Sequence, residues 1–197
     1  FEKVKELDVS LLVNNVGISH LVQVILDRTL RPADCTEIEE QINVNINTMT
    51  YLAHRLIPAF LERKHARSAI INLSSQSTKV SMRNLSVYTA TKAYNDHLSR
   101  CLSQDFKGIW YLIKENWTFW IVRQYSFNAG TNYTKDEWGC SSEQCARWAL
   151  KALGKTDYTA GHWKHTFQEW MVGMLGSTLT QWFGEKKMKD VTIGKQA

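Results

Sequence analysis

The stretch Leu11-Leu12-Val13-Asn14-Asn15-Val16-Gly17 decides the fold of this chain. Its apolar residues continue a short run that begins at Val9 and stops at two asparagines and a glycine. A short apolar run without alternation, bounded by turn residues, is typical of a strand that is buried on both faces of a parallel sheet. We therefore expect such a strand over residues 9–13, with polar side chains after its carboxyl end.

Downstream of this strand, helix and strand patterns alternate. Apolar residues recur at helical spacing between residues 49 and 60, although Pro58 is expected to kink or shorten the last turn. A second buried-strand candidate over residues 69–73 leads through a polar loop into a helix over residues 88–106. Strand, helix, strand and helix in this order predict an α/β fold with a doubly wound parallel sheet.

The second half of the chain predicts one further strand and one further helix. Residues 109–113 and 119–122 both have the composition of strands, while a doubly wound sheet needs only one strand there. Ser141 and Gln144 form a capping box that opens a helix, and Gly154 can end it. The side chains of this helix that are expected to face inward are Cys145, Trp148, Ala149, Ala152 and Leu153.

The bulk composition indicates one soluble globular domain. The chain has 197 residues, of which 44% are hydrophobic and 22% are charged, which is enough for one buried core. No apolar run reaches the roughly 20 residues that span a bilayer. We divide the chain into a domain over residues 1–165 and an amphipathic tail over residues 166–197 that is not a separate domain.

Charge and cysteine content restrict the ligands. The net charge of +5 suits a nucleotide phosphate, a CoA ester or an anionic membrane surface, and scattered solvated lysines explain it equally well. We expect no nucleic-acid partner. The four cysteines lack the paired spacing of metal ligands, so free buried thiols in a reducing compartment are expected. No metal is predicted, because His162 and His165 by themselves give a metal site little support.

Polar side chains gather where the predicted strands end. Ligands of open parallel sheets bind beyond the carboxyl ends of the strands. Three polar clusters lie at such places, and their chain order puts them on one rim. They are Asn14, Asn15 and Gly17 after the first strand, Ser74 and Ser75 after the second, and the helix start from Tyr88 to Lys92.

These motifs, taken together, resemble those of the classical short-chain dehydrogenases/reductases. Residues 12–17 resemble the N-N-x-G segment of that family, and Tyr88-x-x-x-Lys92 resembles its Y-x-x-x-K motif. Ser75 lies thirteen residues before Tyr88, as the family's catalytic serine does, and Asn45 falls where the family carries its catalytic asparagine. The amino-acid sequences of these segments are most similar to those of the microsomal branch of 3-oxoacyl-CoA reductases and 17-beta-hydroxysteroid dehydrogenases.

The resemblance implies a role for each site residue. Tyr88 would donate or accept the proton, and Ser75 would stabilise the developing alkoxide. Lys92 would bind the cofactor ribose and lower the tyrosine pKa, which is near 10 in a free side chain. Asn45 would hold a relay water, although Asn43 and Asn47 are equally well placed by composition. The implied cofactor-binding residues are Asn14, Asn15, Gly17, Tyr88, Lys92 and Thr131.

The implied activity is reduction of a ketone on a lipid-like substrate, either a 3-oxoacyl-CoA or a 17-keto steroid, with NADP(H) or alternatively NAD(H) as cofactor. The implied location is the endoplasmic reticulum membrane, with the cytoplasm as the alternative. The rival interpretation is a catalytically incomplete paralogue or truncated product that acts as a binding or dimerising module.

Two segments depart from the family pattern. The glycine-rich turn T-G-x-x-x-G-x-G does not occur in these residues, so we expect an N-terminally truncated Rossmann-like sheet. Residues 108–118 look divergent. The tail over residues 167–183 has a helical apolar face, which is expected to pack on the domain or in a homodimer. Its alternative is a membrane interface beside the lysines at 186, 187 and 189.

Overall fold

The structure, a computed structural model, describes residues 7–19, 35–63, 67–79, 85–107, 119–126 and 141–175. The last described element is a helix over residues 163–175. The preceding elements are β1 (Leu11–Asn14), α2 (Cys35–Ile42), a π-helical turn (Asn43–Asn47), α3 (Thr48–Glu62), β2 (Ser68–Ser75), a 3-10 turn (Gln76–Lys79), α4 (Ser86–Lys107), β3 (Phe119–Ser126), α6 (Ser142–Ala152) and β4 (Tyr158–Thr159).

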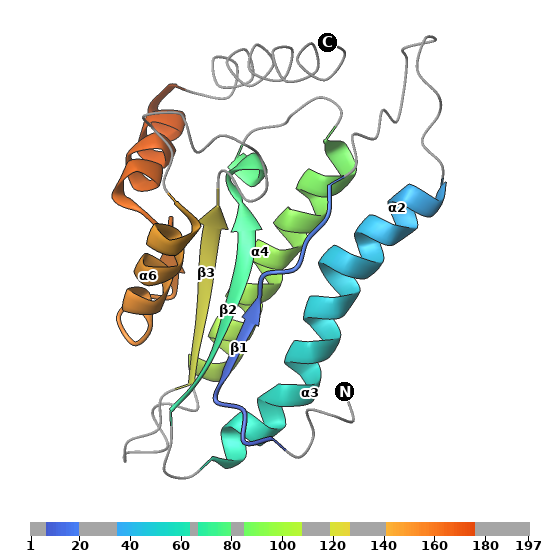
Figure 1. Ribbon diagram of the computed structural model, residues 1–197, viewed down its shortest axis with the longest axis vertical. Coiled ribbons are helices and arrows are strands. Elements are labelled where there is room, and N and C mark those ends of the chain that lie inside the picture. The colour runs from blue at the N-terminus through green and yellow to red at the C-terminus, as the bar shows by residue number, and fades with distance from the viewer. Residues whose placement is uncertain are drawn as a thin grey trace.

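Within the described residues the four strands form one sheet in the order β1-β2-β3-β4 (Figure 1). All of their pairings are parallel, with Leu12 opposite Ile70 in the first pair and Ile71 opposite Val122 in the second. Parallel neighbours need crossover connections, and α3 and α4 lie in two of them. The predicted α/β fold with a parallel sheet is therefore confirmed.

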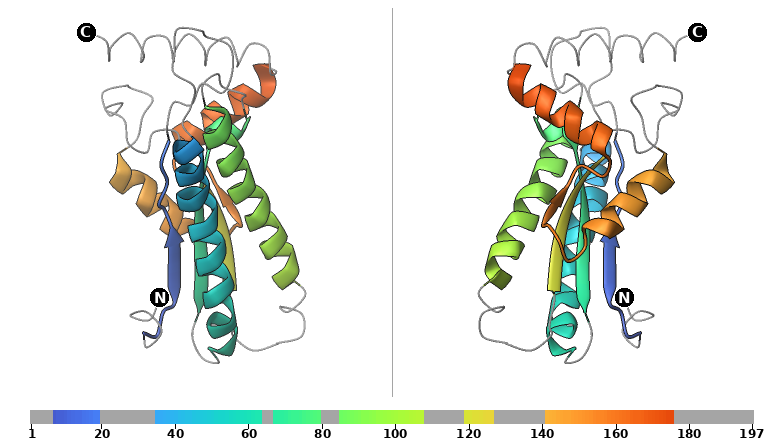
Figure 2. Two further views of the ribbon diagram at one scale, coloured as in Figure 1. Left: turned by 90° about the vertical axis from the view of Figure 1, so that its right-hand side faces the viewer. Right: turned by 90° about the vertical axis from the view of Figure 1, so that its left-hand side faces the viewer.

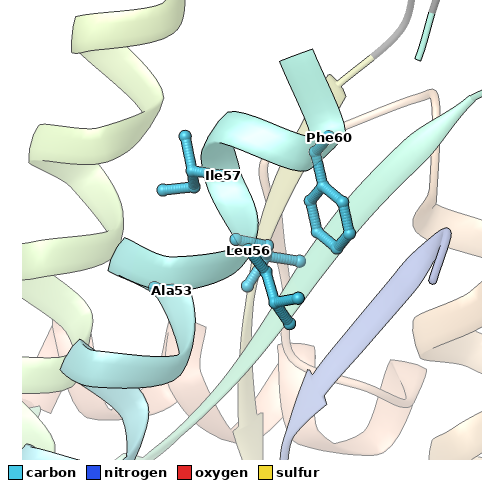
Figure 3. Packing of buried hydrophobic residues seen from close by; sticks show 5 residues of the cluster. Ala53, Leu56, Ile57 and Phe60 are labelled. Atoms are coloured by element: carbon cyan, nitrogen blue, oxygen red, sulfur yellow. The ribbon is translucent and has the colours of Figure 1, made fainter. Parts of the chain in front are cut away.

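Helix α3 covers one face of the sheet. Its buried side chains Ala53, Leu56, Ile57 and Phe60 form a cluster with Ile70 of β2. Figure 3 shows Leu56 and Phe60 reaching from α3 toward the strands, while Ile57 lies on the side of α4. The helical spacing that predicted this helix therefore corresponds to the stripe that packs on the sheet.

The other face of the sheet is covered by α6. Ile71 follows Ile70 in β2 and, because side chains alternate along a strand, points to the opposite face. There it packs with Ala152 and Leu153. Figure 2 shows α4 and α6 on opposite sides of the sheet. Helices on both faces are the doubly wound arrangement that the element order predicted.

Three residues or motifs were expected to begin or end helices: the capping box, Gly154 and Pro58. The capping box of Ser141 and Gln144 is present at the start of α6, and Gly154 follows the helix with φ 75°, so both signals are confirmed. Of the kink or shortening expected at Pro58, the shortening is wrong, because α3 continues through the proline to Glu62. Buried side chains on both sides of the proline hold this helix against the sheet.

Some predictions about single side chains are wrong or fall outside the described residues. Trp148 was expected to face inward and is 44% exposed, because α6 packs mainly through its small residues. Cys101 of α4 is an exposed free thiol. The segment 108–118 lies outside the described residues, and the predicted boundary after residue 165 falls inside the helix over residues 163–175. No helix in the described ranges is long and apolar enough to cross a membrane.

Candidate active site

The end of β2 and the first turns of α4 bring three predicted site residues together. Ser75 is the last residue of β2, and Tyr88 and Lys92 lie one helical turn apart in α4. The Tyr88 side chain is hydrogen-bonded to that of Ser75. The Lys92 Nζ atom lies 5.8 Å from the centre of the Tyr88 ring. The structure therefore places these side chains in contact, and their catalytic roles stay predictions.

The environment of Tyr88 keeps its phenol protonated. Burial raises the pKa of Tyr88 above its usual 10.0, and the hydrogen bond to Ser75 lowers it by less. The net shift is therefore upward because burial is the larger cause, and the expected lowering of this pKa by Lys92 stays a prediction. The Lys92 ammonium lies beside the ring and donates to the Leu73 carbonyl oxygen at 3.2 Å. At neutral pH Tyr88 therefore keeps its O–H proton.

Lys92 is the buried cation of the site. Its side chain is 5% exposed, and burial lowers its pKa from 10.5 to about 8. At pH 7 the ammonium form still predominates. Its backbone carbonyl oxygen accepts a hydrogen bond from Ser74 Oγ at 2.8 Å. Ser74, to which we had assigned no role, therefore ties α4 to the end of β2 directly beside Ser75.

Gly17 lies where the loop after β1 passes the lysine. A Cβ atom at this position would lie 2.9 Å from Lys92 Nζ and 3.4 Å from Asn45 Oδ1. The first of these distances is shorter than real Cβ contacts. Glycine at position 17 therefore leaves the space that the ammonium occupies.

Asn45 connects the loop after β1 to α4. Its Oδ1 accepts from the Ile18 backbone N–H at 2.8 Å, and its Nδ2 donates to the Ile18 carbonyl oxygen at 2.9 Å and to Thr91 Oγ1 at 3.0 Å. Asn43 and Asn47 instead bond each other through their side chains at 2.7 Å. Of the three asparagines, Asn45 is the one at the site, while its relay role stays a prediction.

Asn14 belongs to a buried chain of polar side chains. Its Nδ2 donates to Asn72 Oδ1 at 2.7 Å, Asn72 Nδ2 donates to Ser99 Oγ at 2.8 Å, and Ser99 donates to the Asn95 carbonyl oxygen at 2.6 Å. This chain joins β1, β2 and α4. We had expected Asn14 to bind cofactor, and the structure gives its amide a partner within the fold.

Two predicted cofactor-binding residues remain, Asn15 and Thr131, and the structure describes only Asn15. Asn15 is exposed, and its backbone N–H donates to the Val13 carbonyl oxygen at 3.1 Å. Thr131 lies outside the described residues. Sequence reasoning assigned no contacts to Ser74, Thr91 or Asn72, because their partners are distant in the chain.

We expect Gly17→Ala to displace the Lys92 ammonium. The clash falls on the end of a flexible side chain, so the lysine moves while the fold is retained. An ammonium that leaves its buried position regains water, and the pKa of Lys92 should rise from about 8 toward 10.5. NMR titration of labelled lysine side chains measures this shift.

Gly173→Ala is the matched control for that experiment. A Cβ atom there meets nothing within 4 Å, so the pKa of Lys92 should stay at about 8. An unchanged Lys92 pKa in Gly17→Ala would show that the glycine does not set the position of the ammonium.

A family profile and curated relatives match the chain. The profile described as short chain dehydrogenase matches residues 1–109. Human "Inactive hydroxysteroid dehydrogenase-like protein 1" is 30% identical over 174 residues, which are 85% of this chain and 49% of that protein. Rat "Very-long-chain 3-oxoacyl-CoA reductase" is 27% identical over 187 residues, 92% of this chain and 56% of that protein. The chain thus spans about half the length of the curated relatives that it matches.

Solved structures share the fold. A 7beta-hydroxysteroid dehydrogenase aligns with a TM-score of 0.65 at 19% identity, over 87% of this chain and 64% of that one. A short chain dehydrogenase from Burkholderia cenocepacia J2315, solved in complex with NADP, aligns with a TM-score of 0.63 at 16% identity, over 85% of this chain and 66% of that one. At these identities the likeness concerns the fold.

Proposed function

The chain belongs to the short-chain dehydrogenase family, and from this premise we propose that it acts as an NAD(P)(H)-dependent oxidoreductase that reduces a ketone on a lipid-like substrate. One observation carries the proposal. The half-buried, protonated phenol of Tyr88 is hydrogen-bonded to Ser75 and lies beside the Lys92 ammonium. A proton donor, a second hydroxyl and a cation at one strand end form a site for a carbonyl oxygen that gains negative charge.

The residues at the rim fit a dinucleotide. Gly17 leaves room for the Lys92 ammonium, which has three N–H donors, of which one goes to the Leu73 carbonyl oxygen. A nicotinamide cofactor supplies a hydride when bound. NADP(H) is our first candidate and NAD(H) the second, and the Burkholderia relative supports the first because it was solved in complex with NADP.

The chain's own residues would complete the reduction. Tyr88 gives its O–H proton to the substrate oxygen as the carbonyl carbon gains the hydride, so the ketone becomes an alcohol. Ser75 lies within hydrogen-bonding distance of the phenol and donates to the same oxygen. Lys92 stabilises the phenolate that remains on Tyr88 until a proton returns from solvent.

A 3-oxoacyl-CoA or a 17-keto steroid is the proposed substrate. The rat relative is named a very-long-chain 3-oxoacyl-CoA reductase, and the name of one solved relative contains hydroxysteroid dehydrogenase. Both names describe ketone or alcohol chemistry on lipids. We also propose a location at the endoplasmic reticulum membrane, on the resemblance to the microsomal branch.

A second candidate function is a binding or dimerising module without turnover. The human relative at 30% identity is named an inactive protein, which favours this alternative. Retention of Ser75, Tyr88 and Lys92 in contact favours the enzyme.

Cofactor binding separates the two functions. Quenching of tryptophan fluorescence by NADPH should be weak in the 197-residue chain, which spans about half of its relatives. A version of the chain extended upstream through a glycine-rich turn should bind NADPH and oxidise it when a 3-oxoacyl-CoA or a 17-keto steroid is added. An extended version that neither binds nor oxidises NADPH would leave the binding module as the function.

A further inference from the structure

The helix over residues 163–175 carries a stripe of large apolar side chains that face solvent. Trp163 is 58% exposed, Trp170 54% and Met174 61%, and Phe167 is exposed between them. Their spacing of four, three and four residues places them on one side of the helix. A helix that buried this side against the domain would hide these residues, so the stripe faces outward from the fold.

The stripe borders an open groove of about 500 Å³. We call the stripe and the groove together the aromatic face. Trp148 of α6 extends it, with its ring centre 5.9 Å from that of His162, and the Phe167 and Trp170 ring centres lie 5.8 Å apart. Burial and the nearby Lys164 lower the pKa of His162 below 6.5, so the histidine is neutral at pH 7. The groove lining thus contains aromatic rings and two threonine hydroxyls, without a charged side chain.

Lys151 and Lys164 are charged side chains that lie close to the aromatic face. The ammonium of Lys151 lies 5.8 Å from the centre of the Trp148 ring, and Lys155 is exposed just beyond α6. The carboxylate of Glu169 is directed away, toward the Tyr158 hydroxyl and to Lys79 at 3.7 Å. The described residues 141–175 hold four Lys and Arg, three Asp and Glu, and three of the eight tryptophans of the chain.

This composition favours a lipid surface over a protein partner. Tryptophan is enriched where hydrocarbon meets headgroups, because its ring is apolar and its N–H is polar. Lysine at the rim is depleted from protein interfaces and is attracted by anionic lipids. Contiguous exposed apolar patches are rare on soluble monomers unless they bind something.

We propose that the aromatic face rests on an anionic lipid bilayer. Trp163, Phe167 and Trp170 enter the boundary between headgroups and acyl chains, and Lys151 contacts lipid phosphates. This contact is independent of the proposed reductase activity, because no residue of the candidate active site belongs to the aromatic face.

Co-sedimentation of the 197-residue chain with vesicles tests the proposal. We expect binding to vesicles of phosphatidylcholine mixed with phosphatidylserine, with a blue shift of tryptophan fluorescence, and weaker binding to phosphatidylcholine alone or in high salt. Trp170→Ala should weaken binding at least about tenfold, which corresponds to about 1.4 kcal/mol, because the variant loses the burial of one large aromatic side chain. Lys151→Glu should weaken binding only to the anionic vesicles.

Tyr51→Ala is the matched control. Tyr51 is an aromatic side chain of α3 that is 63% exposed, and its removal should leave vesicle binding unchanged. Circular dichroism verifies that each variant is folded. Equal binding by Trp170→Ala and the parent chain would overturn the proposal. So would absence of vesicle binding, including the case where Trp170→Ala dissociates a dimer, since the aromatic face would then bind a second copy.

Discussion

Tyr88→Phe is expected to lower the rate of ketone reduction about a thousandfold, which is within the range of proton transfer by a positioned side chain. The substitution removes the O–H proton and the hydrogen bond to Ser75, and it leaves the ring beside Lys92 in place. NADPH affinity should change little, because the ammonium stays. The measurement is NADPH oxidation with a 3-oxoacyl-CoA or a 17-keto steroid, in the chain extended upstream through a glycine-rich turn.

Tyr94→Phe is the control for that loss. Tyr94 lies in the same helix, and its hydroxyl is 3.0 Å from Thr50 Oγ1 at an exposed position, apart from Ser75. Its substitution should remove a hydroxyl from α4 without lowering turnover more than about twofold, since surface substitutions have small effects. If Tyr88→Phe retained the parent rate, Tyr88 would not be the proton donor.

Lys92→Met is expected to stabilise the chain at pH 7 and to abolish part of its pH dependence. The pKa of Lys92 is about 8 in the folded chain and 10.5 by its usual value. Between these pH values the unfolded state binds more protons, so the free energy of unfolding of the parent chain should rise with pH. The rise over the whole window is roughly 3 kcal/mol. Below pH 8 the buried ammonium imposes its full cost.

Urea unfolding between pH 7 and pH 10 measures this difference. Methionine has similar length and no charge, so Lys92→Met should start from a higher stability at pH 7 and show no comparable rise. The gain in the free energy of unfolding of Lys92→Met is reduced by about 1 kcal/mol, because the Leu73 carbonyl oxygen loses its hydrogen-bond donor. Lys151→Met, at an exposed lysine, should keep the pH dependence of the parent chain. A parent chain whose stability is flat from pH 8 to pH 10 would contradict a lowered pKa at Lys92.

Local patterns in the sequence predicted the frame of the site. The apolar run before Asn14 located β1, although its expected burial is wrong at Leu11 and Val13, which are 37% and 46% exposed. The thirteen-residue separation placed Ser75 beside Tyr88. These predictions succeeded because strand ends and helix starts of a parallel sheet meet at one rim, whatever the details of packing.

The sequence did not reveal which groups each side chain would meet. Spacing along α4 places Lys92 one turn from Tyr88, but it does not show how far the phenol is withdrawn from water, so the upward direction of the tyrosine pKa shift was not predicted. Trp148 failed for a related reason. A helical apolar pattern does not say whether the domain supplies a surface to cover it, and this tryptophan remains 44% exposed.

The buried polar chain from Asn14 through Asn72 to Ser99 has a consequence for how these positions can vary among related sequences. Loss of one member leaves a buried donor or acceptor without its partner at a cost of about 1–3 kcal/mol, whereas exchange of both members for apolar residues of similar shape can be nearly neutral. Substitutions at these three positions should therefore be correlated. An alignment of related chains should show them changing as pairs, with single replacements under-represented.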